Sequence, residues 1–172
     1  ITLQNMVLQL VFMVISFALA EGSCPNLFDD IGNCCFYFSH DHGMGTNGIT
    51  ETWSRARNYC HDLGELLGET IDLAEVGTSH GQCTEDFELM QIIGSKVSTT
   101  WLGASDQDSE GEWVWQHSKE TFPLSSNMWE CTHPSGGTDH NCLATIANGT
   151  HHRAYLYDGR CTNYWHFVCQ IF

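Results

Sequence analysis

Histidines, carboxylates and cysteines are the residues of this chain whose types and spacing could do chemistry. His133 and His140 flank Asp139, and Asp158 follows further along the sequence. Carboxylate and amide oxygens suit a hard cation such as calcium, whereas imidazole nitrogens suit zinc. The helical motif His-Glu-x-x-His of zinc hydrolases is absent from the sequence, so these residues indicate ligand binding rather than catalysis.

Nine cysteines in 172 residues indicate either an exported disulfide framework or a set of metal ligands. The N-terminal segment favours export, because an apolar run from Met6 ends in the small-x-small pattern Ala18-Leu19-Ala20. We interpret residues 1–20 as upstream sequence plus a secretory signal peptide that starts at Met6. The expected location is extracellular, and no other segment is apolar enough for membrane insertion.

The charge of the chain excludes two classes of partner. With 21 acidic and 6 basic side chains, the formal net charge is -15. Such a chain lacks the basic surface that nucleic acids and anionic membranes require. A hydrophobic share of 42% supplies a core and argues against disorder. The length of residues 21–172 predicts a single domain.

Short elements must position the reactive residues. Segment 24–38 has turn residues at its centre and predicts a hairpin, and the apolar spacing over 50–63 predicts a helix. A second, weaker helical pattern begins near Thr84, and after Gly94 short aromatic and β-branched segments predict strands. Two helices followed by several strands predict an α+β fold. Segment 123–141 has little periodicity and is long for a loop, which indicates a functional region.

A series of motifs then occurs in one order along the chain. They are Cys24-Pro25, Cys35-Phe36-Tyr37-Phe38, Thr52-Trp53, Tyr59-Cys60, Leu73-Ala74-Glu75, Trp101-Leu102-Gly103, Glu110-Gly111, Trp113, Trp115, Trp129, Pro134, Cys142, Cys161 and Cys169. On these residues the chain resembles the C-type lectin-like domain from Cys24 to Cys169. The resemblance implies two helices packed on short, mostly antiparallel sheets, with a long irregular loop region and disulfide staples. It also implies that the first four tryptophans are core residues.

The resemblance assigns six of the nine cysteines. It implies the disulfides Cys60–Cys169, Cys142–Cys161 and Cys24–Cys35, although the adjacent Cys34 could replace Cys35 in the hairpin. Three cysteines are left without family partners. We expect one further pair and one free thiol, which is either buried or available for an intermolecular bridge that would give a homo-oligomer. The three are Cys34, Cys83 and Cys131.

In the resembled family, a calcium ion in the long loop holds sugar hydroxyls. Its ligands come from a Glu-Pro-Asn type of tripeptide, a Glu before the inner cysteine and an Asn-Asp pair after it. Here these positions read His133-Pro134-Ser135, His140-Asn141 and Tyr157-Asp158. Only Asp158 is kept, and one carboxylate lacks the charge to compensate for dehydration of the ion. The sequence therefore predicts a degenerate calcium site, for which Asp139 is the nearest replacement ligand.

A second calcium position of the family keeps more of its ligands. Asp106 and Glu110 match two of its carboxylates, while the remaining ligands fall on Gly136, His140 and Asn141. The alternative is a solvated acidic turn that binds no ion. The candidate calcium ligands over both positions are Asp106, Glu110, Asp139 and Asp158.

Three interpretations remain for the histidines of the long loop. They are loop residues that have abandoned the ion, metal-free contacts to sugar, or ligands of zinc. Trp129 is expected to anchor the loop rather than to stack on sugar. The sequon at Asn148 predicts N-glycosylation, with an unmodified Asn-Gly turn as the alternative.

We therefore predict a secreted carbohydrate-binding lectin of innate immunity that recognises microbial or cell-surface glycans. The alternative is a calcium-independent lectin-like scaffold that binds a protein or another non-sugar ligand. The ligand-facing residues are expected in the long loop and on the neighbouring strand. They are Trp129, His133, Pro134, Ser135, His140, Asn141, Tyr157 and Asp158.

Overall fold

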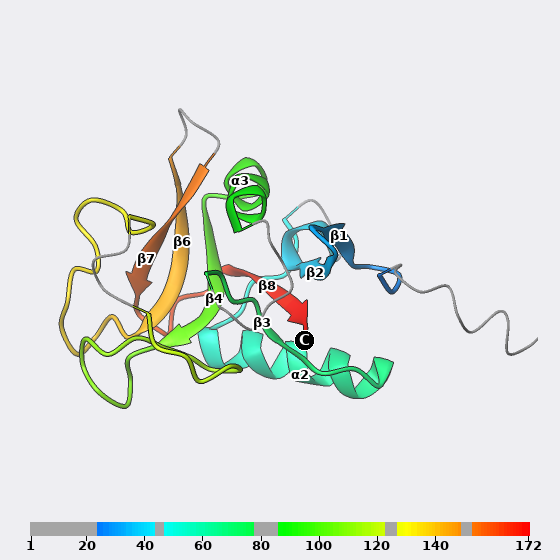
Figure 1. The fold of residues 1–172 in the computed structure, drawn as a ribbon, viewed down its shortest axis with the longest axis horizontal. Coiled ribbons are helices and arrows are strands. Elements are labelled where there is room, and N and C mark those ends of the chain that lie inside the picture. Colours follow the sequence, from blue (N-terminus) through cyan, green and yellow to red (C-terminus); the bar gives the residue numbers. More distant parts are fainter. Residues whose placement is uncertain (1–23, 44–46, 78–85, 123–126, 149–152) are drawn as a thin grey trace, which may run out of the picture.

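A computed structural model of the protein describes residues 24–43, 47–77, 86–122, 127–148 and 153–172. Residues 1–20 lie outside these ranges, so the signal peptide stays a prediction. Among the described residues, no helix has both the length and the apolar character that a membrane span requires. The elements are β1 (Asp29–Ile31), β2 (Cys34–Phe38), the 3-10 turn η1 (Ser39–Asp41), α2 (Trp53–Leu67), β3 (Ile71–Leu73), α3 (Asp86–Lys96), β4 (Thr99–Ser105), β5 (Val114–Trp115), β6 (Cys142–Asn148), β7 (Arg153–Gly159) and β8 (His166–Ile171) (Figure 1).

The two helices begin close to the predicted positions. Thr52, in an extended conformation, precedes α2, and the helix continues past Leu63 to Leu67. It ends where Gly68 takes a left-handed conformation with φ of 73°, which a residue without a Cβ adopts at low cost. The first described residue of α3 is Asp86, and Thr84 lies outside the described residues.

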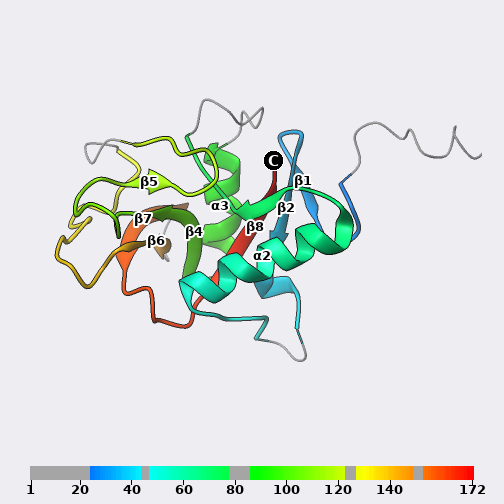
Figure 2. The same cartoon turned by 90° about the horizontal axis from the view of Figure 1, so that it is seen from below.

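The strands form a mixed sheet in the order β1-β2-β8-β4-β6-β7, with β3 added on β8 and β5 on β4. All pairs are antiparallel except β4 with β8. Figure 2 shows α2 lying across one face of the sheet. The fold is α+β, with two helices and short, mostly antiparallel strands, as the sequence predicts.

Two clusters of buried side chains form the core. One cluster packs α2 against β3, β4 and β8 and contains Trp53 and Trp101, which are 5% and 0% exposed. The other packs α3 against β4, β6 and β7 and contains Trp113 and Trp115, which are both 1% exposed. All four tryptophans are therefore core residues, as predicted.

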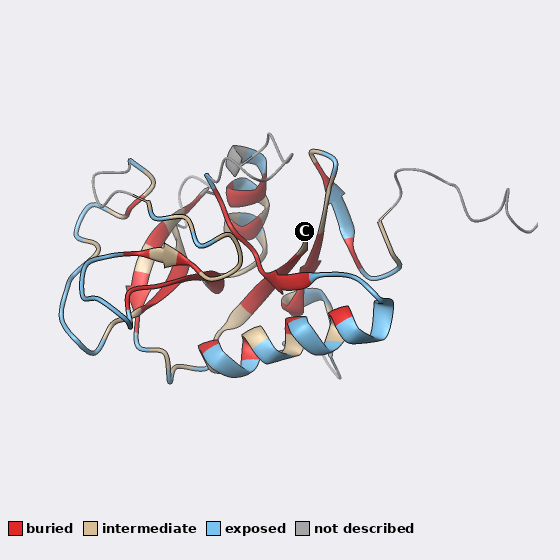
Figure 3. Cartoon of the chain, turned by 60° about the horizontal axis from the view of Figure 1, so that its bottom comes forward, coloured by how far each residue is buried: buried red, intermediate tan, exposed pale blue. Residues whose placement is uncertain are grey.

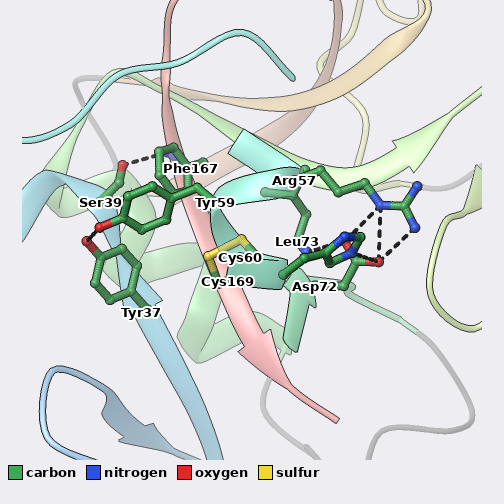
Figure 4. Close-up of a disulfide and its surroundings, with 10 residues drawn as sticks. Tyr37, Ser39, Arg57, Tyr59, Cys60, Asp72, Leu73, Phe167 and Cys169 are labelled. Carbon is green, nitrogen blue, oxygen red and sulfur yellow. Dashed lines mark hydrogen bonds and ion pairs between the residues drawn. A yellow bond between two sulfur atoms is a disulfide. The ribbon is translucent and has the colours of Figure 1, made fainter. Parts of the chain in front are cut away.

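A disulfide joins the helix of the first cluster to the last strand. Cys60 of α2 pairs with Cys169 of β8, and both are fully buried (Figure 4). Beside it, Arg57 donates to both carboxylate oxygens of Asp72 in β3, at 2.8 to 3.1 Å. These contacts bind α2 to the two strands that it covers.

The other cysteines follow the implied pattern. Cys24 pairs with Cys35, and Cys142 pairs with Cys161. The hairpin bridge therefore uses Cys35, and Cys34 is disulfide-bonded as well. Cys83 lies outside the described residues, and Cys131 is free and exposed.

The irregular connections gather at one end of the molecule. Residues 106–113, between β4 and β5, and residues 127–141, before β6, project from the end opposite to β1 and β2. Most of these residues are exposed, whereas the strands behind them are buried (Figure 3). The sheet thus serves as the base on which these two loops stand.

Candidate functional site

The long loop, residues 127–141, is attached along β7. Leu156 of β7 donates its N–H to Met128 O at 2.8 Å and accepts from Glu130 N at 2.9 Å. The indole of Trp129 is 7% exposed and meets Trp113 edge to face at a centroid distance of 5.3 Å. Trp129 therefore anchors the loop in the core, and its ring is not available for stacking on a sugar.

Asp158, at the end of β7, is the centre of the contacts that shape this loop. Its side chain is 1% exposed, and its carboxylate accepts hydrogen bonds from four donors of the loop. His133 Nδ1 binds one oxygen. The other oxygen accepts from Ser135 N at 2.9 Å, Ser135 Oγ at 2.8 Å and Gly136 N at 3.3 Å.

The surroundings keep the Asp158 carboxylate ionised. Burial raises the pKa of Asp158, but the hydrogen bonds from His133 and Ser135 outweigh this effect, and the net pKa lies below its ordinary value. The imidazole of His133 also packs on Tyr157, with ring centroids 4.2 Å apart. Its Nε2 lies 4.0 Å from Glu130 Oε2. His133 is thus placed between two carboxylates and an aromatic ring.

The residues at the first calcium position do not fit calcium. The ion needs about six to eight oxygen ligands, whereas the Asp158 oxygens are already directed at protein donors. The nearest side chain is an imidazole, which is a poor ligand for calcium. The structure brings four of the predicted site residues together. His133 and Ser135 are hydrogen-bonded to Asp158, and Tyr157 packs on the His133 ring.

At the second calcium position, side-chain oxygen atoms remain available to bind an ion. The side chain of Asp106 is buried, and its Oδ1 atom has no hydrogen-bond partner, nor has the buried Oδ1 of Asn141. Burial, followed by the charges of Glu110 and Asp158, raises the pKa of Asp106. Asp106, Asn141 and Glu110 would hold a calcium ion here, where it would join the two loops. Within the described ranges, however, no three His, Cys, Asp or Glu side chains are grouped closely enough to bind a metal ion, zinc included.

A cavity of about 350 Å³ opens beside this position. Three connections line it: the β4–β5 loop, the long loop and the turn between β7 and β8. The sequence prediction includes Asp139 and Asn141 as site residues and Cys161 as a disulfide partner. The other lining residues belong to no family motif and are recognisable only as neighbours of Asp106 and of the disulfide. The lining residues are Gln107, Thr138, Asp139, Asn141, Arg160, Cys161 and Thr162.

Three further predicted residues are not among the hydrogen-bond donors to Asp158. Pro134 and His140 are half-buried in the long loop. Asn148 is the last residue of β6, and residues 149 and 150 of its sequon lie outside the described residues, so glycosylation stays a prediction. The free thiol of Cys131 donates to Glu130 Oε1 at 3.0 Å, and this carboxylate raises the pKa of Cys131.

Comparison with known proteins gives a consistent set of relatives. Residues 49–171 match the family model of the Lectin C-type domain. The chain is 30% identical over 144 residues to the mouse low affinity immunoglobulin epsilon Fc receptor, covering 83% of this chain and 37% of the receptor. It is 27% identical over 150 residues to perlucin of Haliotis laevigata, covering 86% of this chain and 82% of perlucin.

Solved structures show the same fold at lower identity. The C-type lectin domain of murine dendritic cell inhibitory receptor 2, solved with an N-glycan, is 18% identical with a TM-score of 0.61, covering 86% of this chain and 98% of that one. A calcium-independent type II antifreeze protein is 20% identical with a TM-score of 0.63, covering 86% and 93%. At these identities the likeness concerns the fold alone.

Proposed function

The chain belongs to the C-type lectin domain family, and on that premise we propose that it is a secreted lectin that binds microbial or cell-surface glycans in innate immunity. Members of this family are binding proteins rather than enzymes, and so is this chain. The sequence of residues 77–81 matches the Gly-x-Ser-x-Gly pattern of a nucleophile elbow. Such an elbow directly follows a strand, whereas β3 ends at Leu73.

The observation that supports glycan binding is the pair of exposed polar loops on a rigid base. Trp129 and the hydrogen bonds to Asp158 hold the long loop in place. Exposed hydroxyls, amides and carboxylates surround these two contacts. Sugars are recognised by such groups because each hydroxyl both donates and accepts hydrogen bonds. Loops held in place before binding lose little conformational entropy when a ligand arrives.

We propose that this binding does not depend on calcium at Asp158. The His133 imidazole and the loop N–H groups already satisfy the carboxylate that would hold the ion. Asp106, Glu110 and Asn141 would hold a calcium ion, because the buried Oδ1 atoms of Asp106 and Asn141 have no hydrogen-bond partner. The ion would supply positive charge beside the two acids and would join the two loops.

A glycan array run with calcium and with EDTA tests the proposal. We expect retention on one class of glycan, at the same strength in both buffers. Retention that EDTA abolishes would contradict the metal-free interpretation but would leave a lectin. No retention on any glycan would favour the second candidate, a scaffold for a protein or another non-sugar ligand. The altered calcium residues favour that candidate, as does the likeness in fold to a calcium-independent antifreeze protein.

A further inference from the structure

The cavity between the three loops is separate from the cluster at Asp158. The donors to Asp158 are His133, Ser135 and Gly136, and none of these three lines the cavity. A ligand in the cavity would therefore leave that network intact. A sugar in this cavity would contact residues of the long loop other than the family's calcium tripeptide.

The walls of the cavity combine donors and acceptors of hydrogen bonds. Arg160 supplies a planar guanidinium and Asp139 a carboxylate, and Gln107 adds an amide. Thr138 and Thr162 add hydroxyls, which donate and accept. A guanidinium and a carboxylate are planar and can each form two parallel hydrogen bonds. Each can therefore bind two neighbouring hydroxyls of a sugar.

The charges of the cavity balance each other. Arg160 Nη2 lies 3.9 Å from Asp139 Oδ2, and both side chains are well exposed, at 59% and 75%. The chain as a whole carries -15, and Asp106 and Glu110 lie in the adjacent loop. An anionic ligand would meet this surplus of negative charge, so a neutral ligand is favoured.

The cavity is also held in shape from behind. The disulfide Cys142–Cys161 ties the turn to β6, and Cys161 O accepts from Trp53 N at 3.0 Å. On the other side, Asn141 O accepts from Asp106 N at 3.3 Å. About 350 Å³ is at the small end of ligand pockets, which suits a single sugar ring rather than a peptide.

From these observations we infer that the cavity lined by Gln107, Asp139, Arg160 and Thr162 binds one neutral hexose unit of a glycan without a metal ion. The inference rests on the proposed function, because it names the place and the class of sugar for that binding. Arg160 and Thr162 contact the sugar hydroxyls, and the Cys161 disulfide forms part of the wall beneath the ring.

The test uses the full chain in EDTA, with mannan beads and an array of neutral and acidic glycans as probes. Thr162→Val removes a lining hydroxyl at nearly constant volume, and Arg160→Gln removes the cation. Thr132→Val, also an exposed threonine of the site region, is the matched control outside the cavity. We expect the concentration for half-maximal retention to rise roughly tenfold in the two cavity variants and to stay within about twofold in the control.

The outcomes separate the two proposals. If the wild-type chain binds neutral glycans and both cavity variants bind as well as it does, the cavity is not the site, although the protein is a lectin. Preference for acidic glycans would overturn the assignment of a neutral sugar. If the wild-type chain is retained by no glycan, both proposals fail. Equal melting temperatures of all variants show that losses do not come from unfolding.

Discussion

At the scale of single residues, Asp158 is the position where a family feature has been turned to a different use. The carboxylate remains, but its partners are an imidazole and three loop donors instead of an ion. Charge-assisted hydrogen bonds of this kind are stronger than those between neutral groups. The four hydrogen bonds to Asp158 therefore hold the long loop against β7.

Replacing His133 should loosen this loop. His133→Gln removes one partner of a buried carboxylate, so we expect the free energy of unfolding to fall by about 1–3 kcal/mol. Urea unfolding measures the change. The control is His140→Gln, a half-buried histidine of the same loop that lies outside the cluster. Equal effects of the two substitutions would mean that the contact to Asp158 contributes nothing specific.

Cys131 should react slowly with thiol reagents near neutral pH. The hydrogen bond to Glu130, followed by that carboxylate's charge, raises the pKa of Cys131, and the thiolate is the reactive form. Glu130→Gln should lower the pKa and speed the reaction of Cys131 with a chromogenic disulfide several-fold at pH 7. Cys131→Ser should abolish the signal. An unchanged rate in Glu130→Gln would show that the contact does not control the thiol.

The sequence predicted some of these residues and not others. His133, Ser135 and Asp158 were predictable as one group because the family motif aligns them. Their hydrogen-bond pattern was not, since it depends on how the loop folds back on β7. Arg160 and Thr162 carry no motif at all, and only the three-dimensional approach of separate loops reveals the cavity that they line.

At the scale of elements, Asp72 links α2 to β3. It is 4% exposed and accepts hydrogen bonds from Nε and Nη2 of Arg57. Its Oδ2 atom lies 3.2 Å from His61 Nε2. Burial raises the pKa of Asp72, but the hydrogen bonds and charge of Arg57, with a smaller contribution from His61, lower it overall. The folded protein thus binds the Asp72 proton less readily than the unfolded chain does.

The resulting pH dependence has a definite sign. Because the folded pKa is lowered, the contribution of Asp72 is fully present above about pH 4, the ordinary pKa of an aspartate. It is lost as the pH falls through the lower, folded value. Asp72→Asn should lower the free energy of unfolding by about 3 kcal/mol at pH 7. The difference in stability between wild type and variant should become smaller as the pH falls.

Unfolding curves between pH 2 and pH 7 check this prediction. Asp62→Asn, which replaces an exposed acid of α2, is the control and should change stability by less than about 0.5 kcal/mol at any pH. A constant difference between wild type and Asp72→Asn across the whole range would contradict the linkage.

The elements themselves were largely predictable, because apolar spacing and turn residues are local signals. The strand β3 and the end of α2 were exceptions, because no strand was predicted over Ile71–Leu73. The apolar pattern fades after Leu63, yet the helix continues to Leu67, with Leu66 80% exposed. What ends it is the left-handed conformation of Gly68. Hydrophobic periodicity predicts the buried part of a helix but not a final turn that extends into solvent.

At the scale of the whole molecule, the disulfides differ in how much chain they close. Cys60–Cys169 spans 109 residues, whereas Cys24–Cys35 spans 11. In the chain-entropy model these loops correspond to about 5 and about 3 kcal/mol. The double variant Cys60→Ala/Cys169→Ala should therefore lose more stability than Cys24→Ala/Cys35→Ala. Thermal and urea unfolding compare them, and the reverse order would contradict the chain-entropy expectation.

The opposite placement of the loops and of β1 has a consequence for how the protein could be displayed. Residues 127–141 project from one end of the domain, and β1 and β2 lie at the other, where a disulfide joins Cys24 to Cys35 of β2. A carrier attached ahead of Cys24 would present the binding face outward, and several copies on one carrier would point the same way. Such an array could raise the avidity for a repetitive glycan coat by roughly 10²–10⁴ with no change in any single site.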